Sequence, residues 1–507
     1  MDNDLNDEPH PIGLAQIADP THAFDTAVPD DGPALAELAA RHTGWGAVRE
    51  RVSRAVRDPN DAEIFAIVGP ALLAVFLDPV MTLVDTAIVG RLGAAELGGT
   101  GLASLIWNFS SALFAFLAVA TTPKVAVHAS KGEDAEASRV IGTTVVIAAG
   151  IGLALGAFYF GMAPVIAERV ASDPAVVPHA AAFLRFRSLA GPFSLVQYVC
   201  IGAFRGFRNT RTPLLAALFS NLFNLSGDLF FIYVLKWGVA GAAAATSISQ
   251  VAGCGILLTL LVRERRLAPP DLARLPDWGG EVMPILRTGV LLAFRTVTGL
   301  AAILSATYHV NRLGAVSLAA HEISRQLWLF SMVIYDSLSI AAQSLVAIRA
   351  GRGDTAAVGG VVRRLLQLAL TWSVLVGIAL WAAQGRVVGI FTRDAAVTAA
   401  VMSVWPLLTV FQPLDACATV LDGTLYGAQA HGFVAKAMGV SAAVCIVTIW
   451  GGMQVAPSLL TVWLGLKVLS FGRPALAAYK LRKLLRAGGR DAARGPGDGK
   501  GAAPAPA

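Results

Sequence analysis

Two carboxylates lie within an almost uncharged stretch of the sequence, the run from Ile64 to Gly90. Asp78 and Asp85 are seven residues apart in this run, which places them on one face of a helix, two turns from each other. The run is long enough to span a bilayer, where an ionised aspartate costs on the order of 3 kcal/mol to insert. Carboxylates at such positions indicate a site that binds a cation or exchanges a proton.

Each of these carboxylates also has a purely structural interpretation. Asp85 would pair with Arg91 or hydrogen-bond to a neighbouring helix, and Asp78 would hydrogen-bond to backbone groups freed by Pro79. A second polar pair, Asn224 and Asp228, lies one helical turn apart in another apolar run, so the two side chains share a helix face.

The composition indicates what kind of element must hold these groups. Of 507 residues, 55% are hydrophobic and only 15% are charged, whereas a soluble protein carries about 25% charged residues. The chain is therefore predicted to be an all-α polytopic membrane protein. Its excess of basic residues falls in short loops and the C-terminal tail, which is typical of membrane topology and does not indicate nucleic-acid binding. Four cysteines form no CxxC pair, so neither a disulfide framework nor a zinc site is predicted.

The apolar runs predict twelve membrane-spanning helices. They lie near residues 64–90, 98–121, 140–161, 183–204, 213–235, 238–262, 283–309, 318–346, 361–383, 400–426, 433–451 and 457–478. The predicted organisation is a disordered N-terminal tail (1–60), a first lobe (61–262), a linker (263–282), a second lobe (283–480) and a disordered C-terminal tail (481–507). Lys and Arg are concentrated in the loops on the side that holds both termini, which predicts that both termini are cytoplasmic.

An internal repeat supports the division into two lobes. The segment GRLGAAELGGTGLASLIW, ending at Trp107, aligns with NRLGAVSLAAHEISRQLW, ending at Trp328, at an offset of 221 residues. The same offset places the two glycines of GAFRGF on those of GTLYGA. A duplicated unit of six helices keeps the same orientation in the membrane, so a pseudo-two-fold axis along the membrane normal is expected, with substrate bound between the lobes.

Several motifs resemble those of a known transporter family. They are VDTAIVGRLG, FRGFRNTRTP, SNLFNLSGDLFFIY and WGVAGAAAATSIS in the first half, and LAAHEISRQLWLFSMVIYDSLSIAAQSLVA and LDGTLYGAQAHGF in the second. By these motifs, over roughly residues 60–480, the chain is identified as a member of the multidrug and toxic compound extrusion (MATE) family. It is most similar to the DinF-like branch, which includes the plant-type organic-anion exporters.

The resemblance implies roles for four polar residues of the first lobe. Asp85 and Asp228 match the carboxylates of that branch, and Asn224 and Thr246 match its other polar positions, a cluster implicated in cation coupling. Desolvation disfavours a charged carboxylate, and two carboxylates in one pocket disfavour each other's ionisation, so the pair suits proton exchange. A sodium ion held by the carboxylates and by the Asn and Thr oxygens is the alternative. Asp78 would extend such a relay toward the cavity.

The resemblance also implies a hinge and a substrate site. Pro70 matches a family proline in a bending helix, and Pro79 interrupts the same helix; a static kink is the alternative for both. Arg295 resembles an arginine of the organic-anion exporters and would grip a carboxylate, unless it forms an internal ion pair with Asp336 or Asp415. The further candidates for substrate contact are Asp336, Gln326 and Gln343, with helix–helix hydrogen bonding as the alternative for the two glutamines.

We therefore expect a secondary active antiporter that exports a small organic anion, such as citrate or an aromatic acid, against a proton or sodium gradient. The alternatives are a multidrug or organic-cation efflux antiporter, a lipid-linked sugar flippase of the same superfold, and a membrane-embedded enzyme, for which no HExxH or GxSxG motif is present. We expect a monomer in the lipid bilayer that has a small-molecule substrate and no nucleic-acid partner. We expect no catalytic residues and no cofactor besides H⁺ or Na⁺. The only bound metal expected is a coupling Na⁺ at Asp85 and Asp228. Both the plasma membrane and the plastid envelope fit the sequence.

Overall fold

The computed structural model describes residues 58–493 except Ser172 and residues 274–275. Residues 1–57 and 494–507, which include most of the two predicted tails, lie outside the described residues. The described part is built from helices, with no strand, and the residues that follow Asp58 form one compact unit. The prediction of an all-helical membrane fold is confirmed.

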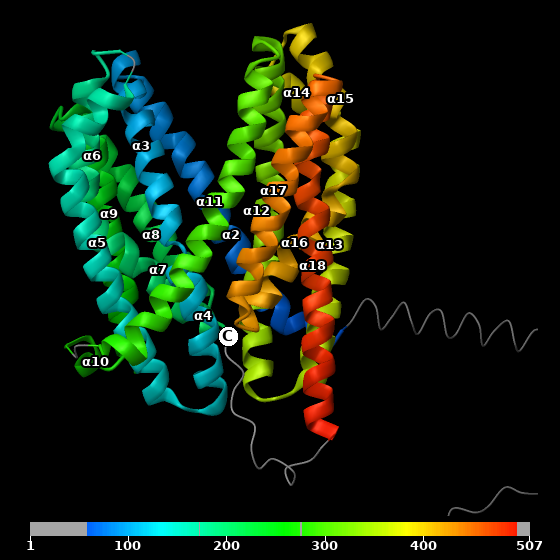
Figure 1. The fold of residues 1–507 in the computed structure, drawn as a ribbon. Helices are drawn as coiled ribbons and strands as arrows, with labels where there is room; N and C mark the ends of the chain where they lie inside the picture. Colours follow the sequence, from blue (N-terminus) through cyan, green and yellow to red (C-terminus); the bar gives the residue numbers. More distant parts are fainter. Residues whose placement is uncertain (1–57, 172, 274–275, 494–507) are drawn as a thin grey trace, which may run out of the picture. The chain divides into compact units, whose positions relative to one another are not determined.

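The helices fall into two groups, which we call the N-lobe and the C-lobe (Figure 1). The N-lobe contains α2 (Asp61–Gly90), α3 (Ala94–Phe114), α4 (Phe116–Lys131), α5 (Asp134–Val170), α6 (Val177–Ser188), α7 (Gly191–Gly206), α8 (Arg211–Asp228), the π-helix η1 (Leu229–Val234) and α9 (Gly238–Arg263). The connecting segment contains α10 (Pro269–Ala273) and the π-helix η2 (Trp278–Val282). The C-lobe contains α11 (Met283–Asn311), α12 (Ala315–Gly351), α13 (Thr355–Ala382), α14 (Gln384–Phe391), α15 (Ala395–Val410), α16 (Gln412–Gly427), α17 (His431–Val455) and α18 (Leu459–Ala493).

Eleven of the twelve predicted membrane spans correspond to described helices that are long and apolar enough to cross a bilayer. Ten spans are long and apolar enough to cross a bilayer, and the count reaches eleven when α15 and α16, which meet at a bend of 51°, are taken as one span. The remaining predicted span, 183–204, corresponds to α6 and α7, which are interrupted at Leu189 and Ala190. Helix α18 continues to Ala493, past the residue at which the C-terminal tail was predicted to begin.

Helix boundaries repeat between the lobes at the offset found in the sequence. Helix α7 spans Gly191–Gly206 and α16 spans Gln412–Gly427, so both ends of α16 lie 221 residues after those of α7. The same offset relates the end of α2 at Gly90 to the end of α11 at Asn311. The repeated sequence thus forms repeated helices.

The repeated glycines make equivalent helix contacts in the two lobes. A Cβ atom on Gly202 of α7 would lie 2.7 Å from the backbone oxygen of Ala118 on α4, and one on Gly423 of α16 would clash with the backbone oxygen of Ser339 on α12. Ala118 and Ser339 are themselves 221 residues apart. Glycine at both places lets two helix backbones approach closely, as small residues do in membrane proteins.

Helix α2 packs against both lobes. In its first half, Ile64 and Ile67 belong to a buried cluster with Tyr335 of α12, whereas Val89 near its end packs against η1 and α9 of the N-lobe. Pro70 lies within the part that contacts the C-lobe, and Pro79 lies between the two parts. A bend at Pro79 would therefore separate the two packing regions of the helix.

Polar contacts join the lobes at the end where α2 begins. Arg364 of α13 donates two hydrogen bonds of 2.7 Å to the carboxylate of Asp61, one to each oxygen. Arg349 of α12 pairs with Glu63 at 2.8 Å, and Glu63 also accepts from Arg208 of the N-lobe at 2.7 Å. We call these contacts the interlobe latch.

Candidate functional site

Asp85 and Asp228 come together inside the N-lobe. Asp85 lies in the last third of α2 and Asp228 is the final residue of α8, and their carboxyl groups share a hydrogen bond. Asp228 is buried and Asp85 is half-buried. Among the described residues no ion pair joins Asp85 to Arg91, so the structure does not favour that alternative.

Asn224 and Thr246 complete the cluster that the family resemblance predicts. Asn224 is buried one turn before Asp228, and its amide nitrogen donates to the hydroxyl of Thr246 on α9 at 3.3 Å. The Thr246 hydroxyl in turn donates to the backbone oxygen of Ala242 at 2.9 Å. Three helices, α2, α8 and α9, thus position four polar side chains, which we call the N-lobe cluster.

The N-lobe cluster retains oxygen atoms that could accept a proton or a cation. The Oδ1 atoms of Asp85 and Asp228 are both buried, and neither has a hydrogen-bond partner within the described part of the chain. Asp78 lies in the same helix α2, but its side chain is outside the described residues, so its predicted relay role stays a prediction.

Three apolar residues cover one end of the N-lobe cluster. Val89, Ile232 and Ala242 form a buried group, and each lies one turn from a member of the cluster: Asp85, Asp228 and Thr246, respectively. We call this group the apolar seal. Ile232 belongs to the π-helix η1, which begins immediately after Asp228; π-helical turns occur often at functional sites. The sequence analysis did not predict this π-helix.

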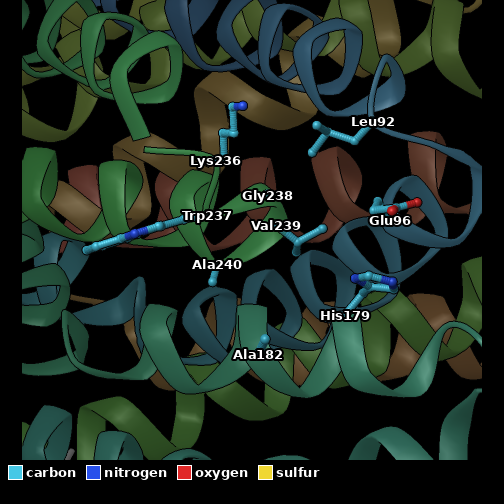
Figure 2. Close-up of a pocket in the computed structure, with 9 residues that line it drawn as sticks. All are labelled: Leu92, Glu96, His179, Ala182, Lys236, Trp237, Gly238, Val239 and Ala240. Carbon is cyan, nitrogen blue, oxygen red and sulfur yellow. The ribbon is translucent and has the colours of Figure 1, made fainter. Parts of the chain in front are cut away.

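A pocket of about 250 Å³ lies beyond the apolar seal (Figure 2). Leu92 lines this pocket and also packs against the seal, while Glu96, His179 and Lys236 surround it as the figure shows. None of the site residues predicted from the sequence lines the pocket. The seal thus separates the pocket from the carboxylates.

Arg295 takes part in an ion-pair group within the C-lobe. Its guanidinium, on α11, donates to the Oδ2 atom of Asp422 on α16 at 2.8 Å, and Arg473 of α18 pairs with the same oxygen. Arg295 also lies over the ring of Tyr426, 5.6 Å from its centroid. The internal ion pair considered for Arg295 therefore forms, but its partner is Asp422 and neither Asp336 nor Asp415.

The three other predicted substrate contacts lie in different environments. Asp336 on α12 is exposed and has Arg295 and Arg473 as electrostatic neighbours, so it belongs to the same charged group. Gln343 is buried and donates to the backbone oxygen of Val119 on α4 at 2.7 Å, which makes it a helix–helix contact between the lobes. Gln326 is exposed and donates to Glu322 at 2.9 Å, within its own helix.

A second buried ion pair, Asp415 with Lys467, was not predicted. The Lys467 ammonium lies 2.9 Å from Asp415, which also accepts from Ser470 and from the Trp328 indole. Both charged side chains are almost fully buried. The sequence did contain a signal, because Lys467 lies 221 residues after Thr246 and is its counterpart in the repeat. The residues equivalent to the other three members of the N-lobe cluster are Ala306, Cys445 and Ile449, so the C-lobe holds no equivalent pair of carboxylates.

The sequence is similar to a known family over a segment of each lobe, and to individual proteins over much of its length. The MatE family model matches residues 70–230 and 292–450, one segment in each lobe. The chain is 34% identical over 389 residues to Protein DETOXIFICATION 44, chloroplastic, of Arabidopsis thaliana, covering 74% of each protein. It is 25% identical over 289 residues to DNA damage-inducible protein F of Escherichia coli, covering 56% of this chain and 62% of that protein.

Solved structures show the same fold. A crystal structure of MATE in the bent conformation superposes with a TM-score of 0.79 at 17% identity, over 87% of this chain and 98% of that chain. The prediction of a two-lobe membrane fold is confirmed by this likeness. With the family model matching both lobes, the chain belongs to the MATE family of multi-pass membrane transporters and is not an enzyme.

Proposed function

We propose that this protein is an antiporter that exports small organic anions in exchange for protons. The observation that carries the anion assignment is the pair of guanidinium groups, Arg295 and Arg473, which share one carboxylate oxygen of Asp422. The buried Nε atoms of both arginines lack partners among the described residues, so each has a donor left for a ligand. A guanidinium binds carboxylates through charge-assisted hydrogen bonds, often in pairs.

The contact between Asp85 and Asp228 supports the proton as coupling ion. Two carboxylates in direct contact cannot both remain ionised, because like charges at that distance repel strongly in a desolvated site. A shared proton removes the repulsion, and its loss restores it. A sodium ion bound by the N-lobe cluster is the alternative that the gradient experiment below distinguishes.

Bending of α2 would transmit a change of charge in the N-lobe cluster to the relative movement of the two lobes. The helix carries Asp85 in its N-lobe part and packs against the C-lobe through its first half, with Pro79 between. A change of charge at Asp85 would alter how the second half of α2 packs against the N-lobe. Proline removes a helix hydrogen bond and makes such a bend easier.

We further propose that both termini face the cytoplasm, as the distribution of basic residues favours. The interlobe latch lies at the end where α2 begins, so in this orientation the structure is closed toward the cytoplasm. An impermeant maleimide tests this orientation on intact cells. A single cysteine at Lys236, at the opposite end, should react without lysis, and one at Lys131 should react only after lysis.

Uptake into proteoliposomes tests the function. The purified protein is supplied with labelled citrate, salicylate or a cationic dye under an imposed pH gradient or an imposed sodium gradient. We expect uptake of at least one acid driven by the pH gradient. Transport of the dye without either acid would contradict the anion assignment, and acid uptake driven only by sodium would contradict proton coupling.

A further inference from the structure

The pocket beyond the apolar seal lies at an end of the N-lobe where membrane spans begin and end. Leu92 lies in the short gap between the span of α2 and the span that contains α3. Lys236 and Trp237 lie in the gap between the span of α8 with η1 and the span of α9. Tryptophan and lysine are typical of the interface between hydrocarbon and water. The pocket is therefore at the depth of the lipid headgroups.

Charged side chains of both signs line this pocket. Figure 2 shows Lys236 and Trp237 on one side of it. Glu96 and His179 lie on another side (Figure 2). They belong to helices in close contact, because a Cβ atom on Gly99, one turn after Glu96 on α3, would lie 2.5 Å from the Cβ atom of His179 on α6. Among the described residues no hydrogen bond or ion pair engages the carboxylate of Glu96 or the ammonium group of Lys236.

An uncommon backbone conformation presents Lys236 to the pocket. Its φ angle is 56°, in the left-handed region that residues other than glycine rarely adopt. Backbone hydrogen bonds fix the turn on both sides of it. The N–H of Leu235 donates to the oxygen of Phe230 at 3.0 Å, and the N–H of Trp237 donates to the oxygen of Phe231 at 3.0 Å. Strained turns of this kind are found at ligand-binding sites.

The π-helix η1, which ends two residues before Lys236, carries an apolar surface next to the pocket. Three of its side chains, Phe230, Tyr233 and Val234, are exposed. A soluble polar ligand would gain nothing from this surface, whereas the acyl chains of a lipid would pack against it. The pocket volume of about 250 Å³ is smaller than the roughly 300–1,000 Å³ of sites for drug-sized molecules, so it suits a small polar headgroup.

We propose that this pocket binds the headgroup of phosphatidylethanolamine. The lipid phosphate contacts the ammonium group of Lys236, and the ethanolamine ammonium donates hydrogen bonds to the carboxylate of Glu96. The acyl chains lie along η1. Phosphatidylcholine has no N–H group to donate to Glu96, and phosphatidylglycerol has no cation, so the charges of the pocket select for ethanolamine. The site is independent of the proposed anion export.

The bound headgroup would also hold the end of α2 next to the start of α9. Leu92, which lines the pocket, packs against the apolar seal, and the seal is formed by residues of α2, η1 and α9. A ligand that contacts both turns stabilises the arrangement in which the seal is closed.

Native mass spectrometry of the full chain in detergent tests the site with three lipids of identical acyl chains: phosphatidylethanolamine, phosphatidylcholine and phosphatidylglycerol. The Kd for phosphatidylethanolamine should be about fivefold or more below that for phosphatidylcholine. Glu96→Gln should raise the Kd for phosphatidylethanolamine about tenfold, as expected for loss of a charge-assisted contact, and leave that for phosphatidylglycerol nearly unchanged. Lys236→Gln should raise the Kd for both lipids about tenfold, because both carry the phosphate.

The matched controls are Glu168→Gln and Arg169→Gln, two exposed positions at the end of α5, and they should leave all three Kd values unchanged. Equal binding of phosphatidylethanolamine and phosphatidylcholine would overturn the proposal. So would an equal loss of phosphatidylethanolamine and phosphatidylglycerol binding in Glu96→Gln, or unchanged binding of both in Lys236→Gln. Size-exclusion chromatography of each variant establishes that a loss of binding is not a loss of folding.

A further measurement distinguishes the lipid from a soluble ligand with the same headgroup. Glycerophosphoethanolamine, which lacks the acyl chains, should displace the lipid only at a far higher concentration. Displacement at a concentration equal to that of the lipid would show that η1 contributes no binding, and would overturn the lipid as occupant. Binding is measured without transport, so a failure of the anion-export function in proteoliposomes does not affect these results.

Discussion

Asp61 and Arg364 join the two lobes through two parallel hydrogen bonds of 2.7 Å. The pair is largely buried and belongs to the interlobe latch with Glu63 and Arg349. In the proposed antiport cycle the lobes open and close at each end in turn, so these contacts would have to break whenever this end opens. Their strength sets how often the lobes separate at this end.

Weakening the interlobe latch should open this end of the protein. Asp61→Asn combined with Glu63→Gln removes the negative charges that hold Arg364 and Arg349, and we expect the open population to rise roughly tenfold, which corresponds to about 1.4 kcal/mol. Spin labels at Lys131 and Arg363, both exposed, report the opening as a longer distance in a background without native cysteines. Glu136→Gln, on an exposed face of α5, is the control. An unchanged distance distribution in the double variant would show that the latch does not hold the lobes together.

Replacing either carboxylate of the N-lobe cluster should uncouple transport from the gradient. Asp228→Asn preserves the shape of the side chain but holds no exchangeable proton, and Asp85→Asn does the same. We expect pH-gradient-driven uptake by both variants to fall to the level of protein-free liposomes, and their exchange rates to lose the dependence on pH between 5 and 8. Glu168→Gln, on an exposed position of α5, should behave like the unaltered protein. Full coupled uptake by Asp228→Asn would exclude the proposed relay.

The buried pair of Asp415 and Lys467 should stabilise the C-lobe only as a pair. Lys467→Met leaves Asp415 as an uncompensated buried charge, and such a loss costs about 3–5 kcal/mol. Replacing both with apolar residues, Asp415→Leu and Lys467→Met, should recover much of the stability. Thermal unfolding in detergent measures both effects as changes in Tm. A double variant less stable than Lys467→Met would contradict this reasoning.

Close helix contacts should make Gly202 intolerant of any side chain. A Cβ there meets backbone atoms of α4, so Gly202→Ala must move α7 away from α4 and lower the Tm. Gly255 in α9 has no atom within 4 Å of an added Cβ, so Gly255→Ala should be neutral or should stabilise the helix by up to about 1 kcal/mol. If both variants show the same Tm, the close approach of α7 and α4 does not contribute to the stability of the protein.

Local patterns in the sequence predicted the elements well. Apolar runs are read directly from residue types, and the repeat offset of 221 places Gly202 and Gly423 on equivalent helices. The four members of the N-lobe cluster were predicted from family motifs, and the structure brings them together. Apolar runs, the repeat and the family motifs are all patterns of residue types along the chain, so each can be recognised without knowing how the helices pack.

Partners across helices could not be predicted in the same way. Arg295 and Asp422 are 127 residues apart, and the choice of Asp422 over Asp336 depends on which faces of α11 and α16 meet. The predicted span 183–204 ends one residue before Arg205, whereas α7 continues to Gly206, because the end of a helix is poorly marked in sequence. Helix packing, which no single-helix pattern records, decides the choice of partner for Arg295.

The apolar seal has a consequence for the order of events in transport. Val89, Ile232 and Ala242 are buried together between Asp85 and Leu92, which lines the pocket beyond them. In the proposed mechanism, ion and substrate would then share one opening, the one between the lobes, and each would enter or leave while that opening faces its own compartment. A shared opening that faces one side at a time suits the proposed exchange, because the departure of one ligand makes room for the other.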